Sequence, residues 1–300
     1  MHNKGRKMKK NIIAAALVAV LGLNASALYF DGGLTGITGP DSYSGYKLNL
    51  VIGEGDLAFE PSITSVRLEN NAGDASTYRT YGLRGAWESD KYTIGGEAGM
   101  TPEVEGYDNK YVGGDITISL SPTSDGKSRL AGPGSRGMAR GGTGITRVDV
   151  GAALKHTMHT QEVGTTDRET SQTAATLFAG ANVLMLNVSA SFTGYSYGDE
   201  DASTLGFVPG HSFANRAMPR SSVNARLDLP STIPMITPFV SYTGTKYKGG
   251  SSALETDSSS TYLLGAYVDL SMVVANISYQ IFNYADDTES FVSIGAGVKF

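Results

Sequence analysis

Apolar and polar residues alternate along most of the chain, in runs of roughly ten residues separated by polar or glycine-rich segments. The run at the carboxyl end, 291–300, is the clearest. Apolar residues occupy its even positions, namely Val292, Ile294, Ala296, Val298 and Phe300, while serine, glycine and lysine fill the positions between them. Side chains two residues apart lie on the same face of a β-strand. The pattern therefore predicts a strand with one apolar face and one small or polar face.

The same alternation recurs upstream. Reading backward from the last run, it predicts strands at 273–281, 261–270, 235–247, 222–229, 184–193, 173–183, 147–155, 111–120, 92–100 and 80–87, with weaker ones at 63–69, 46–52 and 28–38. The total is about 14, and about 12 or about 16 also fits, because the first three strands are poorly defined and predicted boundaries err by a few residues.

The final strand, with its terminal aromatic residue Phe300, resembles the last strand of bacterial outer-membrane proteins. In that class the terminal Phe serves barrel assembly. The resemblance implies an all-β fold, a transmembrane up-and-down antiparallel β-barrel of the broad porin-like class. It also implies outer-membrane lipid and the barrel-assembly machinery as partners. An even strand number suits a single-chain bacterial barrel. A soluble β-sandwich has a similar composition but explains neither the terminal Phe nor so many long strands.

The amino-terminal residues read as an export signal. Lys4 to Lys10 is basic, Ile12 to Leu23 is apolar, and Ala25-Ser26-Ala27 is a small-x-small cleavage site. An apolar stretch of this length is too short to span a bilayer as a helix. We therefore expect a signal peptide at 1–27 and an outer-membrane β-barrel at 28–300, in a Gram-negative-type bacterium. A retained membrane anchor is the alternative.

Charge and cysteine content narrow the class further. The chain has 24 basic and 29 acidic residues and no Cys, so it has no disulfide and is not a lipoprotein. The predicted signal carries five of the basic residues and none of the acidic ones, which leaves a net charge of 19 − 29 = −10 after cleavage. Such a balance argues against nucleic acid as a partner.

The connections between the predicted strands alternate in length. Short ones fall at 88–90, Asn182, 230–234 and 271–272, and long polar ones at 156–172, 198–219 and 248–257. Short periplasmic turns and longer outer loops alternate in this way in outer-membrane barrels. One long connector, 122–142, falls where a short periplasmic turn is expected. It is glycine-rich and basic, and its cations are Lys127, Arg129, Arg136 and Arg140. Three roles stay open for it: a constriction inside the lumen, a periplasmic contact, or a linker.

Charged residues also fall on the inner faces of the predicted strands. Parity places these side chains inward: Arg84, Glu97, Asp115, Arg147, Asp149, Lys155, Arg226 and Asp228. Rings of charge in a pore set ion preference, and because both signs are present we expect no strong selectivity. A barrel of about 14 strands leaves space for an aqueous path, whereas eight strands are filled by side chains. The alternative is a narrow lumen closed by salt bridges.

These observations predict a porin-like channel for passive diffusion of small hydrophilic solutes. The second reading is a structural or surface-interaction barrel, adhesin-like, with a plugged lumen. The third is a lipid-modifying enzyme of the outer membrane, which the histidines do not favour. His156 and His159 flank an expected loop without a supporting acid at metal-ligand spacing, and His211-Ser212 lacks the order of a catalytic pair on a strand. We expect no catalytic residue, no metal and no cofactor; the solute and the oligomeric state stay open.

Overall fold

The structure is a computed structural model of the full 300-residue chain. The residues that it describes are 28–40, 42–54, 56–69, 75–89, 91–120, 147–163, 165–183, 186–198, 218–229, 235–248, 257–270, 272–284 and 287–299. The expected signal peptide at 1–27, the whole basic connector 122–142 and the terminal Phe300 lie outside these ranges; the connector's cations are Lys127, Arg129, Arg136 and Arg140. Those three predictions therefore stay predictions.

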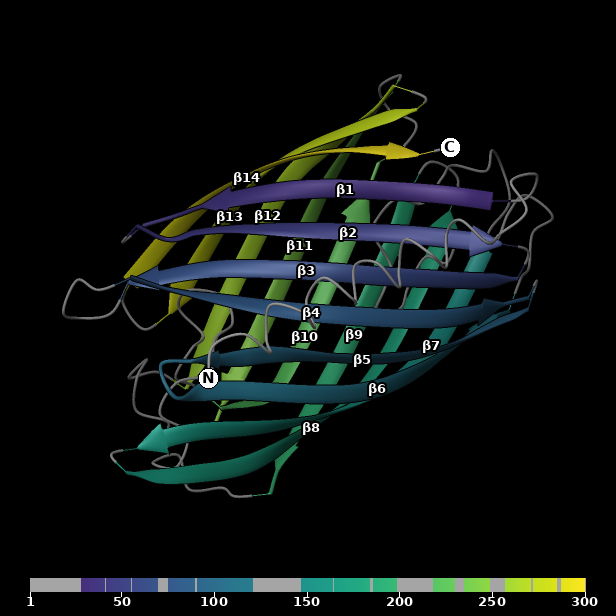
Figure 1. The fold of residues 1–300 in the computed structure, drawn as a ribbon. Helices are drawn as coiled ribbons and strands as arrows, with labels where there is room; N and C mark the ends of the chain where they lie inside the picture. The colour runs from purple at the N-terminus through teal and green to yellow at the C-terminus, as the bar shows by residue number, and fades with distance from the viewer. Residues whose placement is uncertain are drawn as a thin grey trace.

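The described residues form fourteen antiparallel β-strands that close into one barrel (Figure 1). Each strand pairs with its neighbours in sequence, which is an up-and-down topology. The predicted fold class and strand number are both confirmed. The strands are β1 (Leu28–Thr38), β2 (Ser44–Glu54), β3 (Leu57–Glu69), β4 (Ala75–Glu88), β5 (Tyr92–Val104), β6 (Tyr107–Ser119), β7 (Arg147–Val163), β8 (Thr166–Val183), β9 (Leu186–Tyr197), β10 (Pro219–Asp228), β11 (Ile236–Tyr247), β12 (Ser258–Leu270), β13 (Val273–Tyr284) and β14 (Asp287–Lys299).

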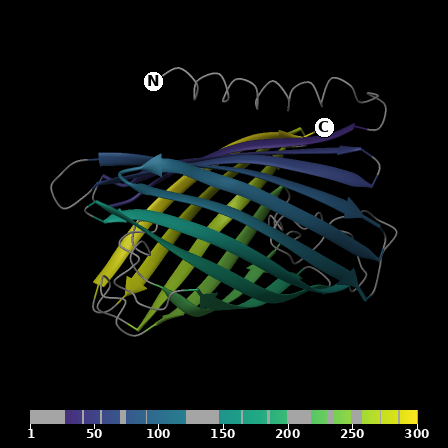
Figure 2. The same ribbon diagram turned by 60° about the horizontal axis from the view of Figure 1, so that its bottom comes forward.

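The barrel closes between its first and last strands. β1 and β14 pair from Asp31 opposite Lys299 to Thr38 opposite Val292. The start of β1 and the end of β14 therefore share one end of the barrel, which we call the terminal end, and the opposite end we call the outer end. Figures 1 and 2 show the strands of one wall crossing those of the far wall at a steep angle, as the tilt of a closed barrel requires.

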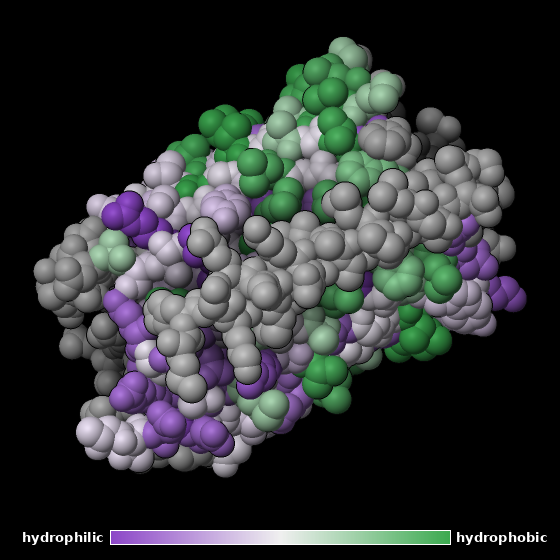
Figure 3. Space-filling view, viewed as in Figure 1, coloured by the Kyte–Doolittle hydropathy of each residue, from purple (hydrophilic) through white to green (hydrophobic). Residues whose placement is uncertain are grey.

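The outer surface of the barrel wall is apolar. On β14 from Thr288 onward the exposed residues are the even-numbered ones, with Ile294 63 % exposed, whereas Phe291 and Gly295 on the other face are buried. Leu177 on β8 and Ile277 on β13 are equally prominent on the exterior. Figure 3 shows such apolar side chains on the outside of the wall, with hydrophilic ones gathered toward one end. This is the surface that a lipid bilayer requires of a barrel.

The inner surface is polar in the middle and aromatic at the outer end. A cluster of buried rings, among them Tyr107 and Phe282, lies on the inner face of the wall at the outer end. Burial raises the pKa of Tyr43, which lies in the turn between β1 and β2. No helix in the described ranges is long and apolar enough to cross a membrane.

Several predicted connections sit where the structure has turns, and one does not. The loop expected at 156–172 is wrong, because β7 runs to Val163 and β8 starts at Thr166. The turn expected at Asn182 lies one step later, between Val183 and Leu186. The bounds expected for 248–257 agree with strands that end at Tyr247 and begin at Ser258.

The failed loop has a physical reason. Residues 156–172 are mostly polar, and we interpreted polarity on both strand faces as a loop. Their register is unbroken from His156 opposite Thr173 to Val163 opposite Thr166. β7 and β8 are the longest strands, 17 and 18 residues. About 9 to 11 residues cross a membrane, so this hairpin extends beyond the bilayer, where no lipid demands an apolar face.

Candidate functional site

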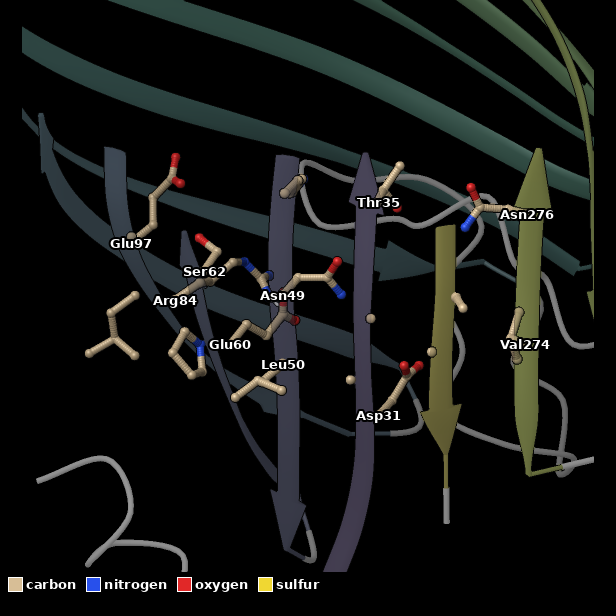
Figure 4. A pocket seen from close by; sticks show the side chains of 18 of the residues that line it. Asp31, Thr35, Asn49, Leu50, Glu60, Ser62, Arg84, Glu97, Val274 and Asn276 are labelled. Atoms are coloured by element: carbon tan, nitrogen blue, oxygen red, sulfur yellow. Dashed lines mark hydrogen bonds and ion pairs between the residues drawn. The ribbon is translucent and has the colours of Figure 1, made fainter. Parts of the chain in front are cut away.

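The candidate site is the inner wall of the barrel near its middle. A cavity of about 390 Å³ lies there, and its lining runs along neighbouring strands from β12 through β13, β14 and β1 to β6. Figure 4 shows side chains from these strands around it. Its lining is largely polar and includes Asp31, Thr35, Lys47, Asn49, Glu60, Ser62, Arg84, Glu97, Tyr111, Tyr267 and Asn276.

Arg84 lies at the centre of the first charge cluster on this wall. Its Nη2 is 3.0 Å from Oδ1 of Asp115, and its Nη1 is 3.1 Å from Oε1 of Glu60. The Nε atom of Arg84 donates a further hydrogen bond to Oδ2 of Asp115 at 3.2 Å. The side chains of Arg84 and Asp115 are only 14 % and 4 % exposed. A guanidinium held by two carboxylates in this way is fixed in position against the wall.

A glycine makes this cluster possible. Arg84 is on β4 and Asp115 on β6, so β5 lies between them, and its residue at this level is Gly95. A Cβ at Gly95 would lie 2.5 Å from Nη2 of Arg84 and 2.6 Å from Oδ2 of Asp115. The absence of a side chain at Gly95 therefore leaves the space through which the two charges meet.

A second, more accessible pair follows along the same wall. Nζ of Lys155 on β7 is 3.7 Å from Oε1 of Glu97 on β5, with side chains 39 % and 26 % exposed. The same ammonium lies 3.6 Å from the ring centre of Tyr111, over its face. A cation on a tyrosine face gains a modest electrostatic attraction. Lys155 is thus held by an acid and a ring together.

The third pair stands elsewhere on the inner wall, on β10. Arg226 Nη2 is 2.8 Å from Oδ1 of Asp228, and its guanidinium carbon lies 4.2 Å from the ring centre of Phe239. Tyr267 packs against Phe239 with ring centres 4.9 Å apart. Arg226 and Asp228 therefore bond to each other along one strand instead of standing free in the lumen.

Of the remaining inward candidates, Asp149 is fully buried and accepts a hydrogen bond from Oγ of Ser119 at 2.6 Å. Arg147 begins β7 opposite Asn182 of β8, and its side chain lies outside the described part of the molecule. The pairing expected between Arg147 and Asp149 is thus untested. The structure brings together Arg84 with Asp115 and Glu97 with Lys155, and it keeps Arg226 and Asp228 as a separate pair.

Sequence reasoning missed three charged residues that line the cavity, Asp31, Lys47 and Glu60. Lys47 lies between Tyr46 and Leu48, and Glu60 follows Phe59, so the alternation that assigned the other inward charges also applies to them. They were missed because they lie on or beside the three poorly defined strands, 28–38, 46–52 and 63–69, to whose faces no inward residues were assigned. Lys47 is exposed to the lumen, and in the part of the chain that the structure describes no carboxylate pairs with it.

The two histidines of β7 lie on opposite faces of the wall. His156 is exposed, and its Nδ1 is 2.9 Å from Oγ1 of Thr173. His159 is buried inside, with its Nδ1 2.9 Å from the hydroxyl of Tyr107. Within the described ranges no group of three His, Cys, Asp or Glu side chains is placed to hold a metal ion. The expectation that these histidines flank a loop is wrong, since both are strand residues.

Comparisons with known proteins address the architecture. No family model and no curated protein matches the chain in sequence. Among solved structures, CdiB from Acinetobacter baumannii aligns at 11 % identity with a TM-score of 0.48, over 92 % of this chain and 60 % of CdiB. The outer-membrane protein OmpT of Vibrio cholerae aligns at 10 % identity with a TM-score of 0.47, over 93 % of this chain and 99 % of OmpT.

OprD of Pseudomonas aeruginosa aligns at 11 % identity and a TM-score of 0.45, over 91 % of this chain and 94 % of OprD. The fold is that of a bacterial outer-membrane β-barrel. Strand pairing, closure and the apolar exterior establish this on their own. Similarities at these scores assign no activity to the chain.

Proposed function

We propose that the protein is an outer-membrane channel for passive diffusion of small hydrophilic solutes. We infer that it is exported by the cleaved signal at 1–27 and inserted with the help of the barrel-assembly machinery. The observation that carries the proposal is the polar cavity inside the barrel, with the exposed ammonium of Lys47 on its wall. A charged group turned into an enclosed space is hydrated there, and water in the lumen is the condition for solute passage.

The experiment is single-channel recording of the refolded protein in planar bilayers, with the ion selectivity measured in a salt gradient. Lys47→Glu reverses one exposed charge on the lumen wall, so we expect the reversal potential to shift toward cations. The matched control is Lys246→Glu, on the exterior face near the end of β11, which should leave the reversal potential unchanged.

A plugged structural barrel is the second candidate, and one observation favours it. The inward pairs of Arg84 with Asp115 and of Arg226 with Asp228 are largely buried, so these charges brace the wall instead of facing a water column. Wild-type protein that is folded in the bilayer but passes no current would reject the channel and support this alternative.

A further inference from the structure

The ring of Tyr111 lies along the inner wall of the barrel, over a glycine of the neighbouring strand. Tyr111 on β6 is directly opposite Gly99 on β5, and Gly99 is directly opposite Gly82 on β4. Directly opposed residues share one face of a sheet. A Cβ at Gly99 would overlap Cζ and the hydroxyl oxygen of Tyr111, and a Cβ at Gly82 would lie 2.6 Å from the same oxygen. The ring therefore occupies space that two glycines leave free, and it lies along the wall instead of across the lumen.

Lys155 covers the face of this ring. Its Nζ lies 3.6 Å from the ring centre of Tyr111 and 3.7 Å from Oε1 of Glu97. Lys155 starts from β7 and Glu97 from β5, and Gly113 of β6 is directly opposite both. The lysine side chain therefore crosses β6 along the wall to reach the ring and the acid. We call Gly99, Tyr111 and Lys155 the lysine stack.

The same order of glycine, ring and cation recurs on another part of the wall. Phe239 on β11 is directly opposite Gly265 on β12, and a Cβ at Gly265 would overlap the Phe239 ring. The guanidinium carbon of Arg226 lies 4.2 Å from the centre of that ring. A Cβ at Gly265 would also lie 2.6 Å from the backbone oxygen of Ile277, so the strand itself requires this glycine. Gly99 is the cleaner position, because its three nearest atoms all belong to the side chain of Tyr111.

The two cations differ in how far they are open to the lumen. The side chain of Lys155 is 39 % exposed and that of Arg226 only 17 %. Tyr111 and Glu97, which hold Lys155, both line the cavity. The effect of a fixed charge on passing ions grows as the distance between them falls. The position of the Lys155 ammonium is therefore the part of this wall that permeating ions sense most directly.

We propose that Tyr111 is the positioning residue for Lys155, and that the empty position at Gly99 sets how far this cation stands into the lumen. With the ring seated on Gly99, the ammonium stays beside the wall and close to Glu97, which offsets its charge. A ring lifted from this seat carries the ammonium toward the barrel axis and away from the acid. This inference rests on the proposed function, because the position of Lys155 affects permeation only if ions pass it.

The experiment measures single-channel conductance and the reversal potential in a potassium chloride gradient for the refolded full-length barrel. Gly99→Ala should lower the conductance, because the displaced ring narrows the lumen, and should shift the reversal potential toward anions. The matched control is Gly96→Ala on the exposed, outer face of the same strand, where the nearest atom to the new Cβ would be a backbone oxygen 3.9 Å away. This control should change neither readout.

Two further backgrounds separate positioning of the cation from a general distortion of the wall. In a Lys155→Gln background, Gly99→Ala should still lower the conductance, but the shift toward anions should be absent. In a Tyr111→Ala background, Gly99→Ala should have no effect on either readout, because no ring remains to be displaced. A shift toward anions that persists without Lys155 or without the ring would overturn the assignment.

Gly82→Ala covers the case in which Gly99→Ala does not fold. Its Cβ would meet only the Tyr111 hydroxyl at 2.6 Å and Oγ of Ser62 at 2.8 Å, both of them side-chain atoms that can move. The effects should have the same direction as those of Gly99→Ala but be smaller, and Tyr111→Phe should abolish them. A conducting wild type with unchanged conductance and reversal potential in the glycine variants would overturn the lysine stack alone. A folded wild type without current rejects the channel, and with it this inference.

Discussion

Arg84 on β4 reaches Asp115 on β6 across Gly95 of the strand between them, with Nη2 and Oδ1 3.0 Å apart. The pair is 31 residues apart in the sequence and is not on neighbouring strands. Both side chains are nearly buried, so the pair ties three strands of the wall together at the level of the cavity.

We expect Arg84→Gln to lower the free energy of unfolding by about 3 kcal/mol, because it leaves the buried carboxylate of Asp115 without its cation. Urea unfolding of the barrel in liposomes measures the change. The double variant Arg84→Gln with Asp115→Asn should recover part of the loss, since no unpaired charge then remains. Lys155→Gln is the comparison at an accessible ion pair, and we expect it to lower the free energy of unfolding by about 1 kcal/mol or less. Equal losses at both sites would contradict the assigned burial.

The two faces of β13 predict unequal tolerance of charge. Ile277 is 54 % exposed on the exterior, whereas Oγ of Ser278 is 2.5 Å from Oγ of Ser293 on the inner face. Ile277→Arg should lower the free energy of unfolding by about 2–4 kcal/mol, because it places a charge in lipid near the bilayer centre. Ser278→Arg should cost much less. Refolding equilibria in liposomes test this, and equal losses would mean that Ile277 does not contact lipid.

Deletion of Phe300 should impair assembly in cells more than it impairs the folded barrel. The described part of β14 already pairs with β1 as far as Lys299, so removal of one further residue leaves the closure contacts in place. Outer-membrane levels of the truncated protein, compared with its unfolding curve after refolding in detergent, separate the two effects. Normal membrane levels would count against a role in assembly.

Deletion of Lys127 to Arg140 should leave the barrel folded. The connector joins β6 to β7 at the terminal end, and a glycine-rich segment with few apolar residues contributes little burial. If the connector enters the lumen, its loss removes four cations, so conductance should rise and selectivity should shift toward cations. Bilayer recordings measure both. Unchanged values would place the segment outside the pore, as a linker or a periplasmic contact.

The alternation of residues determined the strands and their faces by itself. Ile294 and Ile277 fall outside and Arg84 and Asp115 inside, because successive side chains of a strand point to opposite sides whatever its partners are. Up-and-down topology followed as well, because short connections allow a strand to pair with its sequence neighbour. One of the three weakly predicted strands, 28–38, has the observed bounds of β1.

Only the tertiary structure decided which inward residues meet. Parity gives a side for Arg84 and Asp115, but their contact also requires the register of three strands and the empty position at Gly95. The alternation of apolar and polar residues did not predict the hairpin at 156–172, because outside the bilayer both faces of a strand are polar. The cluster of buried rings at the outer end likewise depends on register, since single aromatic residues scattered over the chain become one packed cluster only when closure brings their strand ends to the same end of the barrel.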